Sequence, residues 1–235
     1  MKNRVHGNTP AWVRLALVAA LCALFCAPTQ AQTDNTPTSD LLKVVVLGDS
    51  LTSGFQLAEK DSFTAQLEYY ARSQRYNVKI INMSRISQTS AQGLYRLDEI
   101  LAAKPDMVLI QLGYNDALQG ISMRELSKNL NTLIHNISYH DIYMVLVRTA
   151  PPPSMGLNDK RDYEYIYLQL VAVYNAVPYF SLLDGVLGNP GMTLDDNTHP
   201  NARGTQLIVS RLFPIMQPLL HYRLQMRRYK ASQKR

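Results

Sequence analysis

The chain has 235 residues, 46% hydrophobic and 18% charged, which is enough apolar material for one ordinary globular domain. Its two cysteines, Cys22 and Cys26, lie within residues 1–31, which excludes disulfides, cysteine–zinc sites and cysteine nucleophiles from the remainder. The net charge of +6 comes from the two ends, because the segment between them has slightly more acidic than basic residues. We therefore expect no nucleic acid as a partner.

Residues 1–31 have the three-part layout of a secretory signal peptide. Basic residues precede an apolar run over residues 15–26, and a small-residue sequence ending at Ala31 follows it. The apolar run is shorter than the roughly 20 residues of a membrane-spanning helix, so we prefer a cleaved signal to an anchor. The sequence thus predicts a periplasmic or secreted protein, with residues 32–40 as a polar linker.

The segment 41–220 alternates apolar runs with helical periodicity. The runs that predict strands cover residues 44–47, 78–81, 107–112, 142–147 and 178–183. Helices are predicted over residues 61–76, 91–101 and 162–174, and over an apolar stripe at 126–137 that Ser122 caps. Pro200 is expected to open the last helix. Such alternation predicts an α/β fold, a three-layer αβα sandwich in which helices cover both faces of a five-stranded parallel sheet.

The segment 221–235 contains six Lys or Arg residues and no Asp or Glu. Pro214 and Pro218 precede it and are expected to kink or end the last helix. We therefore interpret the segment as a basic C-terminal tail that is solvated and frayed. The weaker alternative is a contact between this tail and an anionic membrane surface.

Ser50 is the first candidate catalytic residue. It follows the first strand in the sequence Gly48-Asp49-Ser50, at the carboxyl end of the strand, where α/β sheets bind their ligands. A serine in this position could be a nucleophile, although Gly-Asp-Ser is also an ordinary turn that ends a strand.

A serine nucleophile needs an imidazole to take its proton and a carboxylate to hold that imidazole. Of the four histidines after residue 31, only His199 lies in a polar loop close to carboxylates. Asp196 precedes His199 by three residues, a spacing that lets its carboxylate reach the ring nitrogen turned away from Ser50. The alternatives are that Asp196 only caps the last helix, or that His199 has a structural role in the loop.

Asn115 follows the third strand in Gly113-Tyr114-Asn115-Asp116. Because the turns after parallel strands meet at one edge of the sheet, we expect Asn115 and the segment 84–90 near Ser50. The side-chain amide of Asn115 could donate to an oxyanion, although Asn-Asp after a strand is also a common turn.

Three blocks, GDSL at 48–51, GYND at 113–116 and DNTHP at 196–200, together resemble the SGNH (GDSL) hydrolase superfamily in order and spacing. Within it, the chain is similar to the periplasmic thioesterase, lysophospholipase and arylesterase group. The resemblance implies Ser50 as nucleophile, His199 as base and then acid, and Asp196 as the carboxylate that orients the imidazole.

The resemblance also implies an oxyanion hole formed by the Ser50 amide, the Asn115 side chain and an amide of the second block. Alignment of that block places its amide at Ser87, where the family usually has glycine. A backbone amide survives this substitution, so the donor is retained. If the position requires a positive φ, serine is strained there by about 1 kcal/mol.

We therefore expect a serine esterase that hydrolyses aryl and short-chain esters, lysophospholipids or acyl thioesters through an acyl-enzyme. Two alternatives stay open: an O-acetyl esterase acting on an exported polysaccharide, and a weakly active or inactive binding protein on the same fold. No metal-ligand cluster or phosphate-binding glycine loop occurs in the sequence, so we expect no cofactor. The expected partner is a small acyl-ester or lipid substrate, and the expected state is a monomer.

Overall fold

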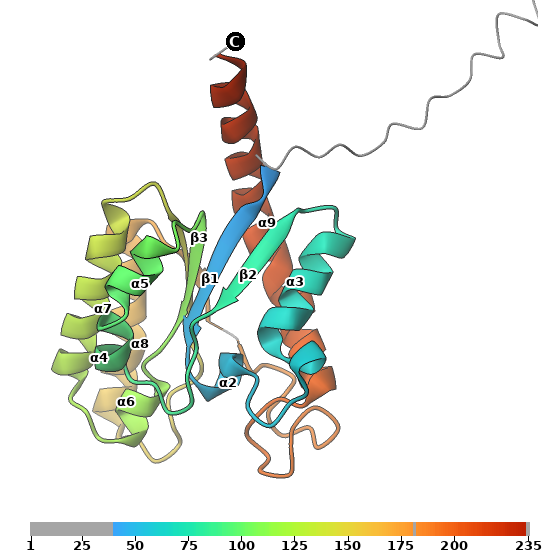
Figure 1. Ribbon diagram of the computed structural model, residues 1–235. Coiled ribbons are helices and arrows are strands. Elements are labelled where there is room, and N and C mark those ends of the chain that lie inside the picture. The colour runs from blue at the N-terminus through green and yellow to red at the C-terminus, as the bar shows by residue number, and fades with distance from the viewer. Residues whose placement is uncertain (1–39, 181, 234–235) are drawn as a thin grey trace, which may run out of the picture. The chain divides into compact units, whose positions relative to one another are not determined.

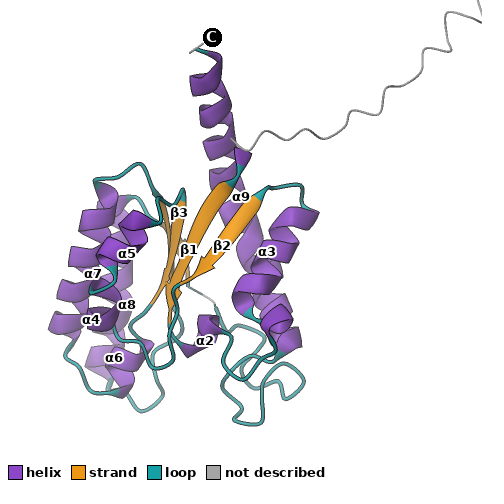
Figure 2. Ribbon diagram, in the orientation of Figure 1, coloured by secondary structure: helices purple, strands orange, loops and turns teal. Residues whose placement is uncertain are grey.

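The computed structural model describes residues 40–180 and 182–233, so the predicted signal peptide and nearly all of the predicted linker lie outside it. Five parallel strands form one sheet with the order β2-β1-β3-β4-β5 (Figures 1 and 2). Helices α3 and α9 cover one face, and α4, α5, α7 and α8 cover the other. The predicted three-layer αβα sandwich is confirmed.

All five predicted strands are present. They are β1 (Leu42–Gly48), β2 (Val78–Asn82), β3 (Met107–Gln111), β4 (Tyr143–Val147) and β5 (Val177–Tyr179). The helices are α2 (Ser50–Ser53), α3 (Phe63–Ser73), α4 (Ser90–Leu94), α5 (Leu97–Ala102), α6 (Tyr114–Leu118), α7 (Met123–Ser138), α8 (Leu157–Tyr174) and α9 (Ala202–Ser232), with a 3-10 turn, η2, at Glu59–Asp61. The fifth strand is shorter than predicted, because the chain turns away from the sheet after Tyr179.

The two faces of the sheet bury different side chains, because successive residues of a strand point in opposite directions. Val44 and Val46 of β1 belong to the core beneath α3 and α9, whereas Val45 and Leu47 belong to the core beneath the other four helices. All four side chains are fully buried. This double burial explains why residues 44–47 of β1 are a continuous apolar run rather than an alternating one.

The helix predicted over 91–101 is two helices, α4 and α5, with Tyr95 and Arg96 between them. Thr89 and Gln92 form a complete capping box at the start of α4. Arg96 leaves helical geometry and turns its guanidinium inward, where it donates to the carbonyl of Met83. The prediction of a single helix was wrong, because apolar periodicity continues across the break and does not reveal it.

Helix α9 begins and ends differently from the prediction. Its N-cap is Asn201, whose side chain accepts hydrogen bonds from two amides of the first turn, so Pro200 precedes the helix rather than opening it. Pro214 and Pro218 lie inside α9 without ending it. Each removes one backbone hydrogen bond, but the buried stripe that includes Phe213 and Leu220 stabilises the helix through tertiary packing.

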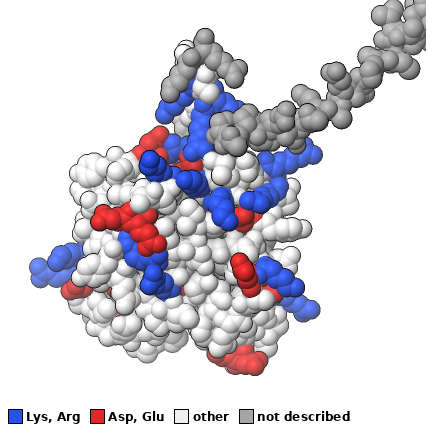
Figure 3. All heavy atoms as spheres, in the orientation of Figure 1, with Lys and Arg blue, Asp and Glu red and all other residues white. Residues whose placement is uncertain are grey.

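Helix α9 continues through the segment 221–232, so the expectation of a frayed tail is wrong for these residues, although most of their side chains are exposed. Arg223 and Arg227 continue the buried stripe of the helix at helical spacing and approach the buried Asp106. The shortest ion pairs of this segment are Arg223–Asp141 at 2.7 Å, Arg227–Asp106 at 2.5 Å and Arg228–Asp40 at 2.8 Å. Figure 3 shows Lys and Arg gathered with some acidic side chains at this end of the domain.

In the part of the chain that the structure describes, no helix combines the length and the apolar character that crossing a bilayer requires.

Asp106→Asn should lower the free energy of unfolding by about 3 kcal/mol, because it removes a buried negative charge that faces two arginines. Urea denaturation measures this change. Asp184→Asn, at an exposed carboxylate without an ion pair in the described residues, should change the same quantity by less than about 0.5 kcal/mol. Equal effects would show that Asp106 does not hold the end of α9.

Candidate active site

The candidate site lies at the carboxyl edge of the sheet, where β1 leads into α2 and β3 leads into α6. Asp49 follows β1 and caps α2, since its carboxylate accepts a hydrogen bond of 2.9 Å from the amide of Leu51. Ser50 is therefore the first residue of α2. The turn that the sequence predicted at Gly-Asp-Ser is also the start of a short helix.

Ser50, His199 and Asp196 form one continuous chain of polar contacts. His199 Nε2 lies 2.9 Å from Ser50 Oγ, and His199 Nδ1 lies 2.6 Å from Asp196 Oδ2. The carboxylate thus meets the ring nitrogen that is turned away from Ser50. Asn201 caps α9, so the alternative in which Asp196 is the cap of that helix is wrong.

Asp196 is held in its ionised form. Burial opposes this, but hydrogen bonds from the amides of His199 and Thr198 and from the His199 ring lower the pKa of Asp196 below its usual value. Both amide bonds measure 2.9 Å. A carboxylate fixed in this way favours the imidazole tautomer with hydrogen on Nδ1, which leaves Nε2 free to accept a proton from Ser50.

Asn115 connects the Ser50 turn to the Ser87 loop. Its Nδ2 lies 3.2 Å from Asp49 Oδ2 and 3.2 Å from the carbonyl oxygen of Gln88. Within the described residues, the main-chain amides of Ser50 and Ser87 donate to no acceptor. The main-chain amides of Ser50 and Ser87, which have no acceptor, and the side-chain amide of Asn115 therefore lie on segments that hydrogen bonds of Asn115 connect.

Ser87 has a φ of 57°, in the left-handed region that favours glycine. The loop is held at both ends. The Arg85 amide donates to the Gly48 carbonyl at 3.0 Å, and both the amide and the hydroxyl of Ser90 donate to the buried Asp116. These anchors in β1 and α6 impose the positive φ on a serine.

A narrow pocket is lined by Ser50, Phe55 and His199. A larger cavity of about 660 Å³ adjoins it, and Gly54 and Leu57 line both. This volume is in the range of ligand-binding clefts. The larger cavity therefore lies next to Ser50 and His199, on the side of α2.

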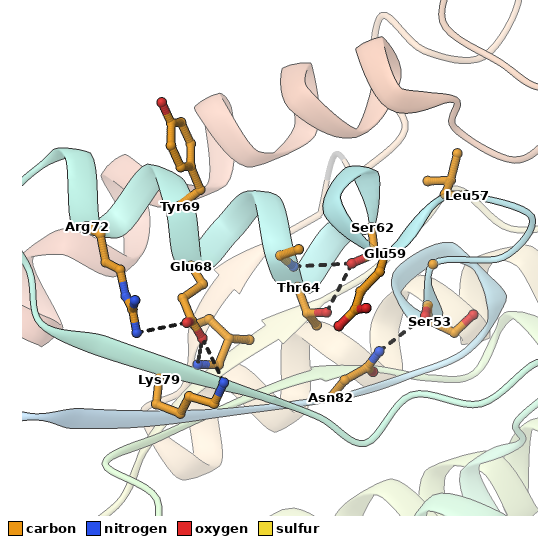
Figure 4. Close-up of a pocket in the computed structure, with 13 residues that line it drawn as sticks. Ser53, Leu57, Glu59, Ser62, Thr64, Glu68, Tyr69, Arg72, Lys79 and Asn82 are labelled. Carbon is orange, nitrogen blue, oxygen red and sulfur yellow. Dashed lines mark hydrogen bonds and ion pairs between the residues drawn. The ribbon is translucent and has the colours of Figure 1, made fainter.

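Figure 4 shows that much of the polar lining of the larger cavity is paired within the chain. Glu68 accepts from the amide of Ile80 at 2.7 Å and pairs with Arg72 at 2.9 Å. Lys79 approaches the same carboxylate to 3.7 Å. These contacts cover β2, which is an edge strand of the sheet and would otherwise expose unpaired backbone groups.

Comparisons with known proteins decide the family. The model of the GDSL-like Lipase/Acylhydrolase family matches residues 46–207. The chain belongs to this family. The resemblance to SGNH (GDSL) hydrolases is thereby confirmed.

The relatives are named as esterases and related hydrolases. The chain is 30% identical to "Esterase TesA" of Pseudomonas aeruginosa over 180 residues, which cover 75% of this chain and 89% of that protein. It is 26% identical to "Thioesterase 1/protease 1/lysophospholipase L1" of Escherichia coli, with coverages of 76% and 85%. A crystal structure of TesA superposes with a TM-score of 0.71 at 28% identity, covering 75% of this chain and 99% of that one. The chain is therefore a carboxylic ester hydrolase.

Among the described residues of this hydrolase, no group of three or more His, Cys, Asp or Glu side chains is placed to hold a metal ion.

Asp49 is a functional residue that the sequence analysis treated only as part of a turn. Its side chain is 1% exposed and accepts further hydrogen bonds from Gln111 Nε2 at 3.0 Å and from Asn115. Burial raises the pKa of Asp49 to about 6, against the opposing effect of its hydrogen-bond donors. In the sequence, the polar Gln111 at the end of an otherwise apolar strand could have indicated that a buried polar partner such as Asp49 lies next to it.

Phe55 is a second residue that the sequence analysis missed. Its ring lies 4.4 Å from the His199 ring, measured between centroids, with the planes inclined at 42°. Gly54, at a φ of 90°, ends α2 and allows the chain to turn so that Phe55 meets the imidazole. The contact restricts the orientation of the His199 ring.

Asp49→Asn should change the pH dependence of stability. The folded protein holds the Asp49 proton more tightly than the unfolded chain, so this group favours folding below about pH 4 and loses that effect as the pH rises through about 6. The free energy of unfolding of the variant, relative to the wild type, should therefore increase by up to about 3 kcal/mol between pH 4 and pH 7.

Urea denaturation at several pH values tests this expectation. Asp98→Asn, at an exposed carboxylate in α5, should show no comparable change. A difference between the Asp49 variant and the wild type that does not vary with pH would contradict a raised pKa at this position.

Ser87→Gly should increase the free energy of unfolding by about 1 kcal/mol, because glycine carries a positive φ without the steric cost that serine has. Arg75→Gly, at a φ of 66° in an exposed turn, is the matched control and should gain a similar amount. Esterase activity should persist in both variants, since the Ser87 amide remains. Loss of activity in Ser87→Gly alone would mean that the hydroxyl, rather than the amide, is required.

Proposed function

We propose that this hydrolase cleaves acyl esters through an acyl-enzyme, with Ser50 as nucleophile, His199 as base and then acid, and Asp196 as the orienting carboxylate. The observation that supports it best is the chain of contacts from Asp196 through His199 to Ser50, at 2.6 and 2.9 Å. Both distances allow direct proton transfer or strong hydrogen bonding.

In the first half-reaction, Ser50 Oγ attacks the carbonyl carbon of the ester while His199 Nε2 takes the hydroxyl proton. The tetrahedral intermediate collapses when His199 gives that proton to the leaving oxygen and the carbon–oxygen bond breaks. The alcohol leaves and the acyl group stays on Ser50. Asp196 stabilises the positive charge on the imidazole throughout, and its lowered pKa keeps it ionised for this purpose.

In the second half-reaction, water replaces the alcohol. His199 removes a proton from the water, the oxygen attacks the acyl carbon, and the proton returns to Ser50 Oγ as the acid leaves. The ring contact with Phe55 keeps the imidazole in one orientation for both steps. The same three residues thus complete the cycle without a cofactor.

We propose that the amides of Ser50 and Ser87 and the side chain of Asn115 stabilise the negative oxygen of the intermediate. The absence of acceptors for the two amides in the described residues supports this, since both donors are available. Asn115 Nδ2 would exchange one of its two long contacts, both 3.2 Å, for the oxyanion. Loss of one such donor typically reduces kcat by a factor of about 10² to 10³.

The proposed substrates are aryl and short-chain esters, lysophospholipids and acyl thioesters. The name of the relative from Pseudomonas aeruginosa, an esterase, supports the esters. The name of the relative from Escherichia coli, a thioesterase and lysophospholipase, supports the thioesters and lysophospholipids. The cavity that shares Gly54 and Leu57 with the narrow pocket supplies the room for a chain or leaving group.

We also propose that the enzyme is exported, on the basis of the signal-like sequence in residues 1–31. The monomeric state stays a prediction. A contact of the basic segment with an anionic membrane stays a prediction. It is weakened by the pairing of Arg223 and Arg228 with carboxylates of the same chain. In Figure 1 this end of α9 also lies opposite α2, so such a contact would direct Ser50 away from the membrane.

Hydrolysis of p-nitrophenyl esters from acetyl to palmitoyl tests the proposal. Ser50→Ala should reduce kcat/KM by a factor of about 10⁴ or more, because the nucleophile is lost. Ser53→Ala, on the same short helix, is the matched control and should keep most of the activity. A fluorophosphonate probe should label the wild type and not the Ser50 variant. Unchanged hydrolysis in Ser50→Ala would exclude the mechanism.

A further inference from the structure

Tyr167 of α8 is a fully buried tyrosine whose hydroxyl contacts the turn between β3 and α6. Its ring packs against the rings of Tyr163 and Phe180, at centroid distances of 5.1 and 6.2 Å. Its Oη donates a hydrogen bond of 2.5 Å to the carbonyl oxygen of Leu112. Leu112 lies directly after β3 and shortly before Asn115. Tyr167 therefore connects α8 to the turn that carries Asn115.

The carbonyl of Leu112 lies beyond the hydrogen bonds of the sheet. Strand β3 ends at Gln111, and within the described residues no main-chain amide donates to the Leu112 oxygen. Leu112 is itself buried, and a buried carbonyl without a donor is unfavourable. The hydroxyl of Tyr167 thus supplies the hydrogen bond that neither the sheet nor α6 provides.

The Tyr167 hydroxyl keeps its proton for this bond. Burial raises the pKa of Tyr167 well above its usual value, so the group stays neutral at the pH of an esterase assay. Tyr163 Oη is a second polar atom near it, at 3.4 Å, which is much longer than the distance to the Leu112 oxygen. The hydroxyl therefore acts as a donor to the turn.

Gly113 allows α8 to approach the turn this closely. It has a φ of 107°, which glycine adopts without the strain of other residues. A Cβ atom at this position would overlap the Tyr167 hydroxyl and would lie 3.2 Å from the side chain of Leu126 in α7. Two helices thus enclose the turn, and glycine leaves the room that the hydroxyl occupies.

Helix α6 depends on contacts of this kind for its position. It has five residues, and the glycine at its N-cap provides no side-chain cap. Asp116 accepts a hydrogen bond of 2.8 Å from the amide of Ser90, which fixes α6 to α4. Tyr167 fixes the start of the same short segment at Leu112. Asn115 lies between these two anchors in the chain.

The side chain of Asn115 is held only by long hydrogen bonds. Its Nδ2 lies 3.2 Å from both Asp49 Oδ2 and the Gln88 carbonyl oxygen, at the upper end of the usual range. The place of its amide therefore depends strongly on where the turn holds its backbone. A small displacement of a catalytic group can lower a rate considerably.

We propose that Tyr167 is a positioning residue for ester hydrolysis, which acts through the Leu112 carbonyl to hold Asn115 where its amide meets the negative oxygen of the intermediate. The proposal rests on the proposed function, because that function makes Asn115 an oxyanion donor. Tyr167 itself touches no reacting atom.

Tyr167→Phe tests the proposal, because it keeps the ring and removes only the hydroxyl. It should lower kcat/KM for p-nitrophenyl butyrate about tenfold, since a displaced donor stabilises the oxyanion less. Tyr179→Phe is the matched control, at a buried tyrosine whose hydroxyl has no partner among the described residues, and should keep the activity. Rates are divided by the folded fraction from urea denaturation, so that lost stability is not counted as lost catalysis. An unchanged kcat/KM in Tyr167→Phe overturns the proposal.

A double-mutant cycle shows whether Tyr167 acts through Asn115. Asn115→Ala alone should lower kcat/KM by a factor of about 10² to 10³, and Tyr167→Phe should then have little further effect. An equal loss from Tyr167→Phe with and without Asn115 would overturn the proposal. If Asn115→Ala changes nothing, the proposed oxyanion donor fails and the positioning role fails with it. An effect of Asn115→Ala without one of Tyr167→Phe overturns the positioning role alone.

An inhibitor that forms an oxyanion separates positioning from packing. With a trifluoromethyl ketone, Ser50 Oγ bonds to the carbonyl carbon, its proton passes to His199 Nε2, and the π electrons of the carbonyl move to its oxygen. The matching methyl ketone is far less prone to form this adduct. Tyr167→Phe should weaken the trifluoromethyl ketone about tenfold relative to the methyl ketone, and Tyr179→Phe should not. An unchanged ratio in Tyr167→Phe would overturn the proposal.

Discussion

The buried carboxylate of Asp49 is the group on which the arrangement of the site depends. It accepts hydrogen bonds from Leu51, Gln111 and Asn115, which belong to α2, β3 and α6. A carboxylate in an almost fully buried place is tolerated only when such donors surround it. The same bonds therefore fix the turn that presents Ser50 and the direction in which Asn115 points. A residue that touches no proposed reacting atom thus sets the positions of those that do.

The sequence was sufficient for the sheet, for its parallel topology and for the elements that carry the site. Strands buried on both faces appear as continuous apolar runs, and Ser50 and Asn115 follow two of them directly. His199 and Asp196 could be selected because few histidines occur and only one lies close to carboxylates in a polar loop. These signals are local, so they can be read without knowledge of the tertiary structure.

The features that the sequence did not reveal depend on contacts between distant segments. The end of α9 is helical because its arginines meet Asp40, Asp106 and Asp141, three carboxylates that are far away in the sequence. At the break between α4 and α5, Arg96 donates to the backbone carbonyl of Met83, outside both helices. A charge pattern or an apolar period contains no information about such partners, so composition alone suggested a frayed tail and one continuous helix.

Two neighbouring residues, Ser87 and Gln88, both have features that lower stability. Ser87 carries a strained positive φ, and its amide remains without an acceptor in the described residues. Gln88 carries a buried carboxamide that has no hydrogen-bond partner among the described residues, while its carbonyl accepts a hydrogen bond from Asn115. Strain and an unpaired polar group both lower stability, and such costs concentrate at sites where the surroundings impose them for function. Their occurrence side by side, in a loop fixed at Gly48 and Asp116, is consistent with a segment whose backbone is held in place for the proposed oxyanion hole.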